Sequence, residues 1–249
     1  MMHTYMPLAA RQFLLRAGRR VLVESLDLSL ASGEVLGILG PNGAGKSTLL
    51  ETLAGLLEPG DGTVELDGTP VMQLAPLDRA RSIALLPQDE ASGYFGSVAD
   101  YVALGRFPHH DTRLDVAPWL AAWELTALAQ RPLPTLSGGE RQRARLAQLA
   151  AQEAGIVLLD EPLTHLDPAH QAALLRWVRD EAGHGRAVAL TLHDPNWAAC
   201  HCDRLLFLHG DGRWQLGTPA DLLQPAALEA LYGPDTAALW ARGAAAQPV

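Results

Sequence analysis

The chain has 249 residues, a net charge of −9 and 48% hydrophobic residues, which suits one sizeable domain or two small ones with a well-filled core. This composition excludes a chain that is disordered as a whole. No apolar run approaches the roughly 18 residues that a membrane-spanning helix requires, and we expect no signal peptide. The acidic balance argues against general nucleic-acid binding, because that affinity comes mostly from Lys and Arg. Two cysteines, Cys200 and Cys202, are too few for a disulfide framework and indicate a reducing compartment.

Hydrophobic periodicity predicts alternating strands and helices on both sides of an all-helical segment. The alternation is typical of an α/β core with a parallel sheet. Residues 97–154 contain no convincing strand and are interpreted as an inserted helical subdomain. In chain order we expect short strands at 21–23 and 26–30, a strand at 35–39, a helix at 48–57, strands at 63–66 and 83–86, helices at 98–104, 116–128 and 140–152, a strand at 156–159, a helix at 168–181, a strand at 187–192, a short helix at 196–200 and a hairpin of 205–208 with 213–216.

The chain's only lysine lies in a glycine-rich segment between a predicted strand and a predicted helix. The segment matches the phosphate-binding loop G-x-x-x-x-G-K-[ST]. Its glycines let backbone N–H groups surround phosphate oxygens, and the helix N-terminus adds positive potential. Lys46 is expected to reach the β- and γ-phosphates and Ser47 to ligate Mg²⁺; a glycine-rich turn without a ligand is the disfavoured alternative. The segment is Gly40, Pro41, Asn42, Gly43, Ala44, Gly45, Lys46, Ser47 and Thr48.

An acidic pair directly follows the apolar run at 156–159. A buried strand that ends in an acid places a carboxylate beside a phosphate-binding loop, where Mg²⁺ needs one. Asp160 is therefore expected to hold the metal or its water, and Glu161 to act as the general base that polarises the attacking water. Taken alone, an acidic pair after a strand is commonplace. Together with the loop, it predicts a P-loop nucleotidase of unspecified kind.

A third motif makes the resemblance specific. Leu136-Ser137-Gly138-Gly139-Glu140 is followed by Arg141-Gln142-Arg143, and with this motif the chain resembles the ATP-binding-cassette (ABC) ATPases. The Ser137 hydroxyl, two glycine N–H groups and a helix that begins at about Glu140 form a second anion-binding element. Two phosphate-binding elements in one chain favour a head-to-tail dimer that sandwiches each ATP between subunits. The alternative is that Ser137 caps only the backbone of its own helix.

Three further residues match elements of this family in order. Gln88 matches the glutamine loop, which joins the core to the helical subdomain and senses Mg²⁺ and water. His193 matches the switch histidine that hydrogen-bonds the γ-phosphate. Asp167 ends a loop, residues 164–167, that contacts the partner's P-loop, and His165 departs from the small residue usual there. The resemblance thus implies Glu161, His193 and Gln88 as catalytic residues.

The family's adenine-stacking aromatic residue is missing from this chain. By its spacing before Val21, the corresponding residue is Arg16. A guanidinium can stack on a planar ring. We therefore expect either that Arg16 stacks on adenine or that it is a solvated surface residue.

The resemblance covers roughly residues 13–233 and implies a single ABC ATPase domain. The expected fold is α/β: a P-loop core with an N-terminal antiparallel β subdomain and an inserted α-helical subdomain. We assign residues 1–88 and 155–249 to the core with the β subdomain, and residues 89–154 to the helical subdomain that carries the signature motif.

Several segments are similar to the ATPases of iron–siderophore, haem and cobalamin importers: residues 98–109, 193–199, 202–204, 217–219 and 231–233. The resemblance implies an ATP-hydrolysing subunit, with ATP and Mg²⁺, that lies peripherally on the cytoplasmic face of the cell membrane. Its expected partners are a second copy, transmembrane permease subunits that dock near Gln88 and residues 94–101, and, indirectly, a substrate-binding protein. The alternative is a soluble ATPase of an iron–sulfur assembly scaffold.

Several other patterns are interpreted as structural. Cys200-His201-Cys202 lacks the second pair that a tetrahedral zinc site needs. Trp119 and Trp123 are four residues apart on one predicted helix and are expected to make packing or partner contacts. The arginines at 141, 143 and 145 are expected to be solvated.

Overall fold

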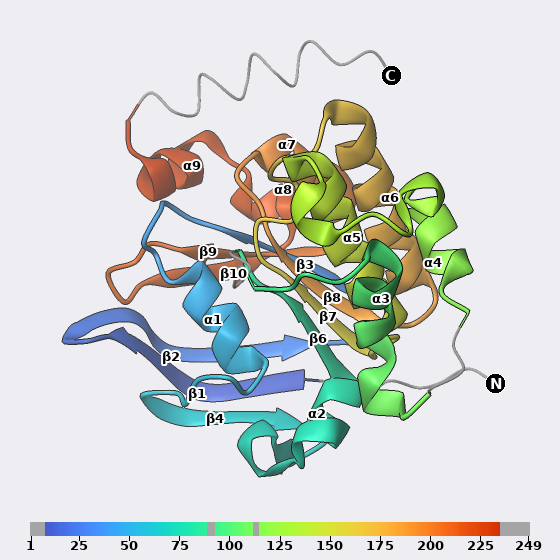
Figure 1. Cartoon of the computed structure of the whole chain (residues 1–249). Coiled ribbons are helices and arrows are strands. Elements are labelled where there is room, and N and C mark those ends of the chain that lie inside the picture. The colour runs from blue at the N-terminus through green and yellow to red at the C-terminus, as the bar shows by residue number, and fades with distance from the viewer. Residues whose placement is uncertain (1–7, 89–92, 112–114, 235–249) are drawn as a thin grey trace.

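The structure, a computed structural model, describes residues 8–88, 93–111 and 115–234. These residues form two β-sheets with helices on and between them, and a group of helices to one side (Figure 1). None of the helices within these residues is long and apolar enough to span a bilayer.

The N-terminal sheet is antiparallel and has the strand order β2-β1-β4-β5. Its long strands pair along most of their length, and Phe13 of β1 opposes Leu26 of β2 with both side chains buried. This sheet is the β subdomain that the resemblance predicted. The two short strands expected at 21–23 and 26–30 form one strand, β2, and the pattern assigned no strand to β1. The four strands are β1 (Leu8–Ala17), β2 (Arg20–Leu30), β4 (Asp61–Leu66) and β5 (Thr69–Pro70).

The second sheet has six strands in the order β10-β9-β3-β8-β7-β6. All neighbours are parallel except β9 and β10, which form the predicted hairpin. Parallel strands place their carboxyl ends at one edge, where ligands bind in open α/β sheets. The strands are β3 (Val35–Leu39), β6 (Ile83–Leu86), β7 (Ile156–Leu159), β8 (Ala187–Thr191), β9 (Arg204–Leu208) and β10 (Trp214–Gly217).

The six-stranded sheet is buried on both faces, which explains its nearly continuous apolar strands. Successive side chains of a strand point to opposite faces. In β3, Leu36 and Ile38 pack in a core shared with the antiparallel sheet and helix α1 (Lys46–Leu53). Val35 and Leu39 pack in the other core, with α6 (Pro168–Gly183) and the helical segment. The first of these cores, which includes Ala44 and Leu49, therefore holds α1 and its preceding loop in place.

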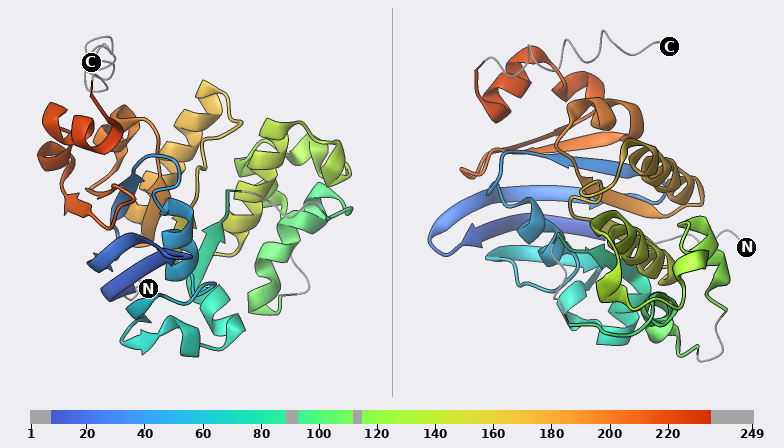
Figure 2. Two further views of the ribbon diagram at one scale, coloured as in Figure 1. Left: turned by 90° about the vertical axis from the view of Figure 1, so that its left-hand side faces the viewer. Right: turned by 45° about the horizontal axis from the view of Figure 1, so that its top comes forward.

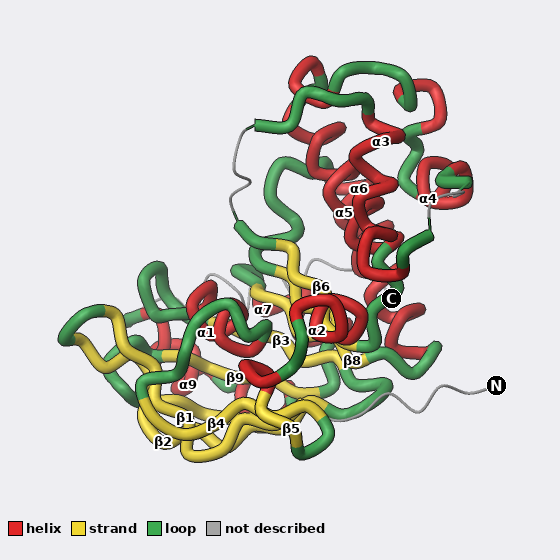
Figure 3. The backbone as a smooth tube through the Cα atoms, turned by 60° about the horizontal axis from the view of Figure 1, so that its bottom comes forward, coloured by secondary structure: helices red, strands yellow, loops and turns green. Residues whose placement is uncertain are grey.

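The helical segment lies to one side of the sheets (Figures 2 and 3). Its longest helix, α5, packs on α3, on α4 and on strand β6 of the core. No strand occurs in its described part, as predicted; the domain boundaries assigned from the sequence stay a prediction. The helices are α3 (Val98–Ala103), α4 (Ala117–Ala122) and α5 (Gly138–Ala151), with 3₁₀ turns at Leu104–His109, Thr126–Leu128 and Leu133–Thr135.

The structure corrects several predicted helices. The helix predicted at 48–57 ends at Leu53, because Gly55 turns the chain with φ +70°. The helix predicted at 116–128 breaks after Ala122, because the backbone turns left-handed at Glu124, with φ +53°. Trp123 at this break is buried against Trp177 of α6, with ring centroids 5.5 Å apart. The pattern did not predict α2 (Pro76–Ser82), α8 (Pro219–Leu222) or α9 (Pro225–Tyr232), whereas α7 (Pro195–His201) matches the short helix expected there.

Candidate functional site

The phosphate-binding loop runs from the end of β3 into α1. Gly45 caps α1 with φ +101°, a conformation that L side chains rarely adopt. A Cβ on Gly45 would also lie 3.0 Å from Leu22 Cδ1 of the antiparallel sheet. Glycine is therefore required here both by the backbone and by the closeness of β2. The tight turn leaves the first N–H groups of α1 free of intrahelical partners and available to an anion.

Lys46 lies inside the loop, with 6% of its surface exposed. Its ammonium donates to the carbonyl oxygens of Gly40, at 2.7 Å, and Pro41, at 3.1 Å. Burial lowers the pKa of Lys46, and the nearby carboxylates of Glu161 and Asp160 oppose this shift. A phosphate group would compensate the buried charge better than these carbonyls do, because charge-assisted hydrogen bonds are the stronger ones.

Asp160 and Glu161, which follow β7, are both hydrogen-bonded to one hydroxyl of the neighbouring strand β8. Thr191, the last residue of β8, donates its Oγ1 hydrogen to Asp160 Oδ1 over 2.9 Å and accepts the Glu161 N–H at 2.6 Å. Asp160 and Thr191 are both buried. Thr191 was not among the residues predicted from the sequence, although its place at the carboxyl end of a core strand was an available signal.

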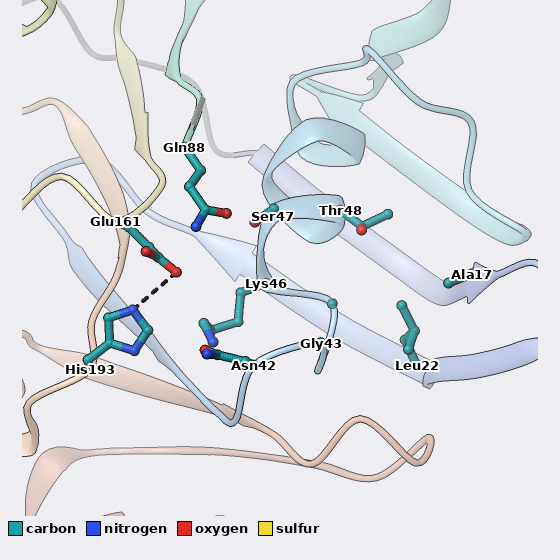
Figure 4. Close-up of a pocket in the computed structure, with 11 residues that line it drawn as sticks. Ala17, Leu22, Asn42, Gly43, Lys46, Ser47, Thr48, Gln88, Glu161 and His193 are labelled. Carbon is teal, nitrogen blue, oxygen red and sulfur yellow. Dashed lines mark ion pairs between the residues drawn. The ribbon is translucent and has the colours of Figure 1, made fainter. Parts of the chain in front are cut away.

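Glu161 and His193 face each other across the site (Figure 4). Glu161 Oε1 lies 3.1 Å from His193 Nε2, and the Glu161 backbone has φ +46°. A non-glycine residue in this left-handed region is strained, and such strain clusters at functional sites. The pair can share a proton between a carboxylate and an imidazole, which is a chemistry suited to general acid–base work.

These residues line one cavity of about 480 Å³, a size typical of ligand sites. One end is polar and lies between the phosphate-binding loop, Gln88 and Glu161. The other end, at the turn between β1 and β2, is aliphatic (Figure 4). The lining residues are Ala17, Leu22, Asn42, Gly43, Gly45, Lys46, Ser47, Thr48, Gln88, Glu161 and His193.

Arg16 does not line this cavity; Ala17, one residue further along, does. The Arg16 side chain is exposed, and its Cγ and Cδ lie near the backbone of Gly60, 3.5 Å from the position of a Cβ there. Neighbouring strand residues point to opposite faces, so an offset of one residue decides which side chain meets the cavity. Stacking of Arg16 on adenine stays a prediction that no contact in the structure supports.

The signature residues lie apart from the cavity, at the start of α5. Ser137 caps this helix: its Oγ accepts the Glu140 N–H at 3.3 Å, while Glu140 Oε2 accepts the Ser137 N–H at 2.8 Å. This hydrogen bond lowers the pKa of Glu140. Gly139 lies so close to the His165 carbonyl oxygen that a Cβ would sit 3.0 Å from it. The signature therefore packs on the 164–167 loop of its own chain.

Asp167 also serves its own helix. It caps α6 by accepting hydrogen bonds at 2.9 Å from the backbone N–H and Nδ1 of His170. These bonds lower the pKa of Asp167, whose side chain stays mostly exposed. Neither Asp167 nor the signature residues contact the P-loop cavity within one chain.

The arginines of α5 are not alike. Arg141 is exposed, but Arg145 is buried and Arg143 is partly buried. The prediction that all three are solvated was therefore wrong for Arg145. Periodicity alone could not place Arg145 inside, because a charged residue is rarely buried without partners, and its main-chain partners, the carbonyls of Pro87 and Gln88, are distant in sequence.

The oxygen donors near the loop fit Mg²⁺, a hard cation that prefers carboxylate, hydroxyl and phosphate oxygens. Ser47 and Gln88 line the cavity, and Asp160 directly follows β7. Elsewhere, no cluster of three or more His, Cys, Asp or Glu side chains that could hold a metal occurs among the described residues. Cys202 is buried, and burial raises the pKa of its thiol to about 12.

A phosphate-binding loop with a buried lysine, next to an acid pair at the end of a parallel strand, defines a P-loop nucleotide hydrolase. Residues 23–164 match the family model described as ABC transporter. The chain belongs to the ABC transporter family and is one of its ATPase subunits.

Comparison with individual proteins points in the same direction. The chain is 46% identical to a hemin import ATP-binding protein of Pseudomonas aeruginosa, over 88% of this chain and 89% of the relative. It is 44% identical to a hemin import ATP-binding protein of Nocardia farcinica, over 86% and 76%. Among solved structures, one described as a metal-chelate type ABC transporter in an inward-facing conformation has a TM-score of 0.77 and 31% identity, over 91% of this chain and 89% of that one.

Proposed function

We propose that the chain hydrolyses ATP to energise the uptake of haem through a separate membrane permease. The observation that carries the ATPase part is the single cavity that brings Lys46, Gln88 and Glu161 together with His193. The similarity to hemin import proteins and to a metal-chelate transporter supports the importer and narrows the cargo class to metal chelates. Haem is the member of this class that the relatives named above import.

Each polar group of the cavity has a proposed role in hydrolysis. The N–H groups of residues 43–48 and the Lys46 ammonium bind the β- and γ-phosphates. Ser47, Gln88 and Asp160 hold Mg²⁺, which neutralises phosphate charge when bound. Glu161 orients the attacking water and accepts its proton, and His193 hydrogen-bonds the γ-phosphate. The aliphatic end formed by Ala17 and Leu22 takes the base.

We propose that the active form is a head-to-tail dimer. The start of α5 is an anion-binding helix N-terminus formed by Ser137, Gly138, Gly139 and Glu140. It does not line the P-loop cavity of the same chain. A second copy would place this helix start over the γ-phosphate, with Asp167 near the partner's P-loop. In the single chain Ser137 caps its own helix, which is compatible with this role, because a capping hydroxyl keeps a further lone pair.

The permease is proposed to dock on the helical segment near Gln88, which positions the chain on the cytoplasmic face of the membrane. Phe95 and Phe107 are 81% and 70% exposed there, an unusual state for phenylalanine on a surface without a partner. Tyr94 and Tyr101, whose ring centroids are 5.3 Å apart, pack against the core. A substrate-binding protein would reach the chain only through the permease.

A pull-down tests the assembly. The tagged Glu161→Gln chain, loaded with ATP and Mg²⁺, is incubated with host membranes in mild detergent, and mass spectrometry identifies the proteins that co-purify. We expect a permease with many membrane spans. A matched Phe95→Ser/Phe107→Ser variant should lose it while keeping ATP binding. Recovery of soluble partners alone would instead favour the iron–sulfur scaffold ATPase.

The cargo is tested after reconstitution of the complex in vesicles. ATP-dependent uptake is compared for haem, cobalamin and a ferric siderophore, each with its binding protein. We expect haem to be taken up at least about tenfold faster, which corresponds to about 1.4 kcal/mol of discrimination. Preferential uptake of either other chelate would reject haem and keep the importer.

A further inference from the structure

A buried arginine of the signature helix holds the backbone of the glutamine loop. Arg145 lies in the middle of α5, with 8% of its surface exposed. Its Nη2 donates to the Pro87 carbonyl oxygen, and its Nη1 lies 3.4 Å from the Gln88 carbonyl oxygen. Pro87 and Gln88 directly follow β6, at the point where the chain leaves the sheet and before the helical segment begins.

A second buried side chain extends this link to the loop after Glu161. Arg145 Nη1 also donates to Gln142 Oε1 at 3.0 Å, and Gln142 Nε2 donates to the Pro162 carbonyl oxygen at 3.0 Å. Gln142 lies one turn before Arg145 on the same helix and is buried. Two side chains of α5 thus contact both loops that lead out of the catalytic cavity.

The guanidinium suits this position because it presents several donors in a rigid plane. Its buried charge requires hydrogen-bond acceptors, so separating it from the two carbonyls would be costly. The glutamine loop and α5 should consequently move together. Because Ser137 caps α5, a movement at the signature motif reaches Gln88 through the helix and Arg145.

We propose that Arg145 is a positioning residue for ATP hydrolysis: it fixes the main chain at Pro87 and Gln88 so that the Gln88 side chain stays at the phosphate end of the cavity. This inference rests on the proposed function of Gln88. It assigns Arg145 no contact with nucleotide. The effect of Arg145 on catalysis must therefore pass through Gln88.

A double-mutant cycle tests this dependence. Arg145→Gln, Gln88→Ala and the double variant are assayed for kcat, for KM of ATP and for the Mg²⁺ concentration at half-maximal activity. We expect Arg145→Gln to lower kcat about tenfold and to raise the Mg²⁺ midpoint, with little change in KM. In the Gln88→Ala background, Arg145→Gln should lower kcat by less than about twofold. Arg145→Lys, which keeps one donor for the Pro87 carbonyl, should recover part of kcat.

Arg143→Gln is the matched control. Arg143 is a partly buried arginine of the same helix, and it donates to the carbonyl oxygens of Trp123 and Glu124, at 3.2 Å each, within the helical segment. This variant should reduce thermal stability by a similar amount while leaving the Mg²⁺ midpoint unchanged. Thermal unfolding of every variant identifies any that fails to fold; if Arg145→Gln fails, the cycle is run with Arg145→Lys.

The outcomes separate this inference from the proposed function. Full additivity of Arg145→Gln and Gln88→Ala, or the same Mg²⁺ shift in Arg143→Gln, would overturn the positioning role while leaving the ATPase intact. Unchanged activity in Gln88→Ala would overturn the role of Gln88 and the inference with it. Absence of hydrolysis in the wild-type dimer would instead reject the proposed function.

Discussion

At the scale of single residues, the site depends on a few side chains whose conformations are costly in isolation. Glu161 has a strained backbone, with φ +46°, and Lys46 is buried against main-chain carbonyls. Asp160 is buried and paired with the Thr191 hydroxyl. Such features persist only where the surrounding structure holds them, which the two cores do here.

Glu161→Gln should bind ATP with near-normal affinity and lose turnover. The amide keeps the shape of the side chain but cannot accept the proton of the attacking water, and removal of a general base costs roughly 10²- to 10⁴-fold. The measurement is single-turnover hydrolysis alongside nucleotide binding by fluorescence. Near-wild-type hydrolysis would reject Glu161 as the base.

Thr191→Val should lower both stability and kcat. Valine fills the same volume but leaves Asp160 Oδ1 and the Glu161 N–H without the hydroxyl, and each unsatisfied buried group costs about 1–3 kcal/mol. Urea unfolding and steady-state turnover measure the two effects. Thr191→Ser keeps the hydroxyl and is the control. If Thr191→Val and Thr191→Ser had the same stability and the same kcat, the hydroxyl would not orient Asp160 or Glu161.

At the scale of elements, helix α5 connects the signature motif with the glutamine loop, two motifs that lie far apart in the sequence. Its first turn is the signature motif, and its buried middle contacts the glutamine loop and the residue after Glu161. The capping box at Ser137 and Glu140 fixes where this helix begins. One rigid helix therefore relates the proposed site for a partner's ATP to the chain's own site.

Substitutions of Ser137 distinguish capping from phosphate binding. Asp caps helices about as well as Ser, whereas Ala costs about 1 kcal/mol. Ser137→Asp should therefore keep the wild-type Tm, but its negative charge beside the γ-phosphate should abolish most hydrolysis. Ser137→Ala should lower Tm and reduce hydrolysis less. Thermal unfolding measures the capping effect, and ATP turnover measures the effect on hydrolysis. A fully active Ser137→Asp variant would mean that Ser137 only caps the helix and does not bind phosphate.

At the scale of the whole molecule, the cavity and the signature are separate surfaces of one chain. The cavity opens between the P-loop, Gln88 and His193, while the signature packs on its own 164–167 loop. In the proposed dimer, the signature of a second copy completes the cavity. Dimerisation should consequently depend on nucleotide.

The Glu161→Gln chain should sediment as a dimer with ATP and Mg²⁺, at twice its 26.6 kDa mass, and as a monomer without nucleotide. Bound ATP that cannot be hydrolysed links the two copies, which stabilises the dimer by mass action. Sedimentation velocity measures the change. The matched Glu161→Gln/Ser137→Asp chain should remain monomeric with ATP; a dimer that forms equally without nucleotide would contradict the sandwich arrangement.

The sequence alone determined the parts of this protein whose physics is local. A phosphate-binding loop needs adjacent glycines, one lysine and a helix start, so the segment from Gly40 to Thr48 was recognisable as printed. Buried parallel strands are continuous apolar runs, and such runs predicted β3, β6, β7 and β8. The two acids were recognisable because they directly follow the run that forms β7. The helical segment was recognisable because no strand pattern interrupts it, and the signature motif was recognised by its resemblance to the ABC ATPases.

Only the tertiary structure decided the contacts that join distant segments. Strand order brings Thr191 to Asp160, and the chain fold brings Glu161 within 3.1 Å of His193. Strand pairing decides that Ala17 and not Arg16 lines the cavity. Helix packing decides that Arg145 is buried. These depend on long-range packing, which a local pattern does not contain, because each is set by residues far away in the chain.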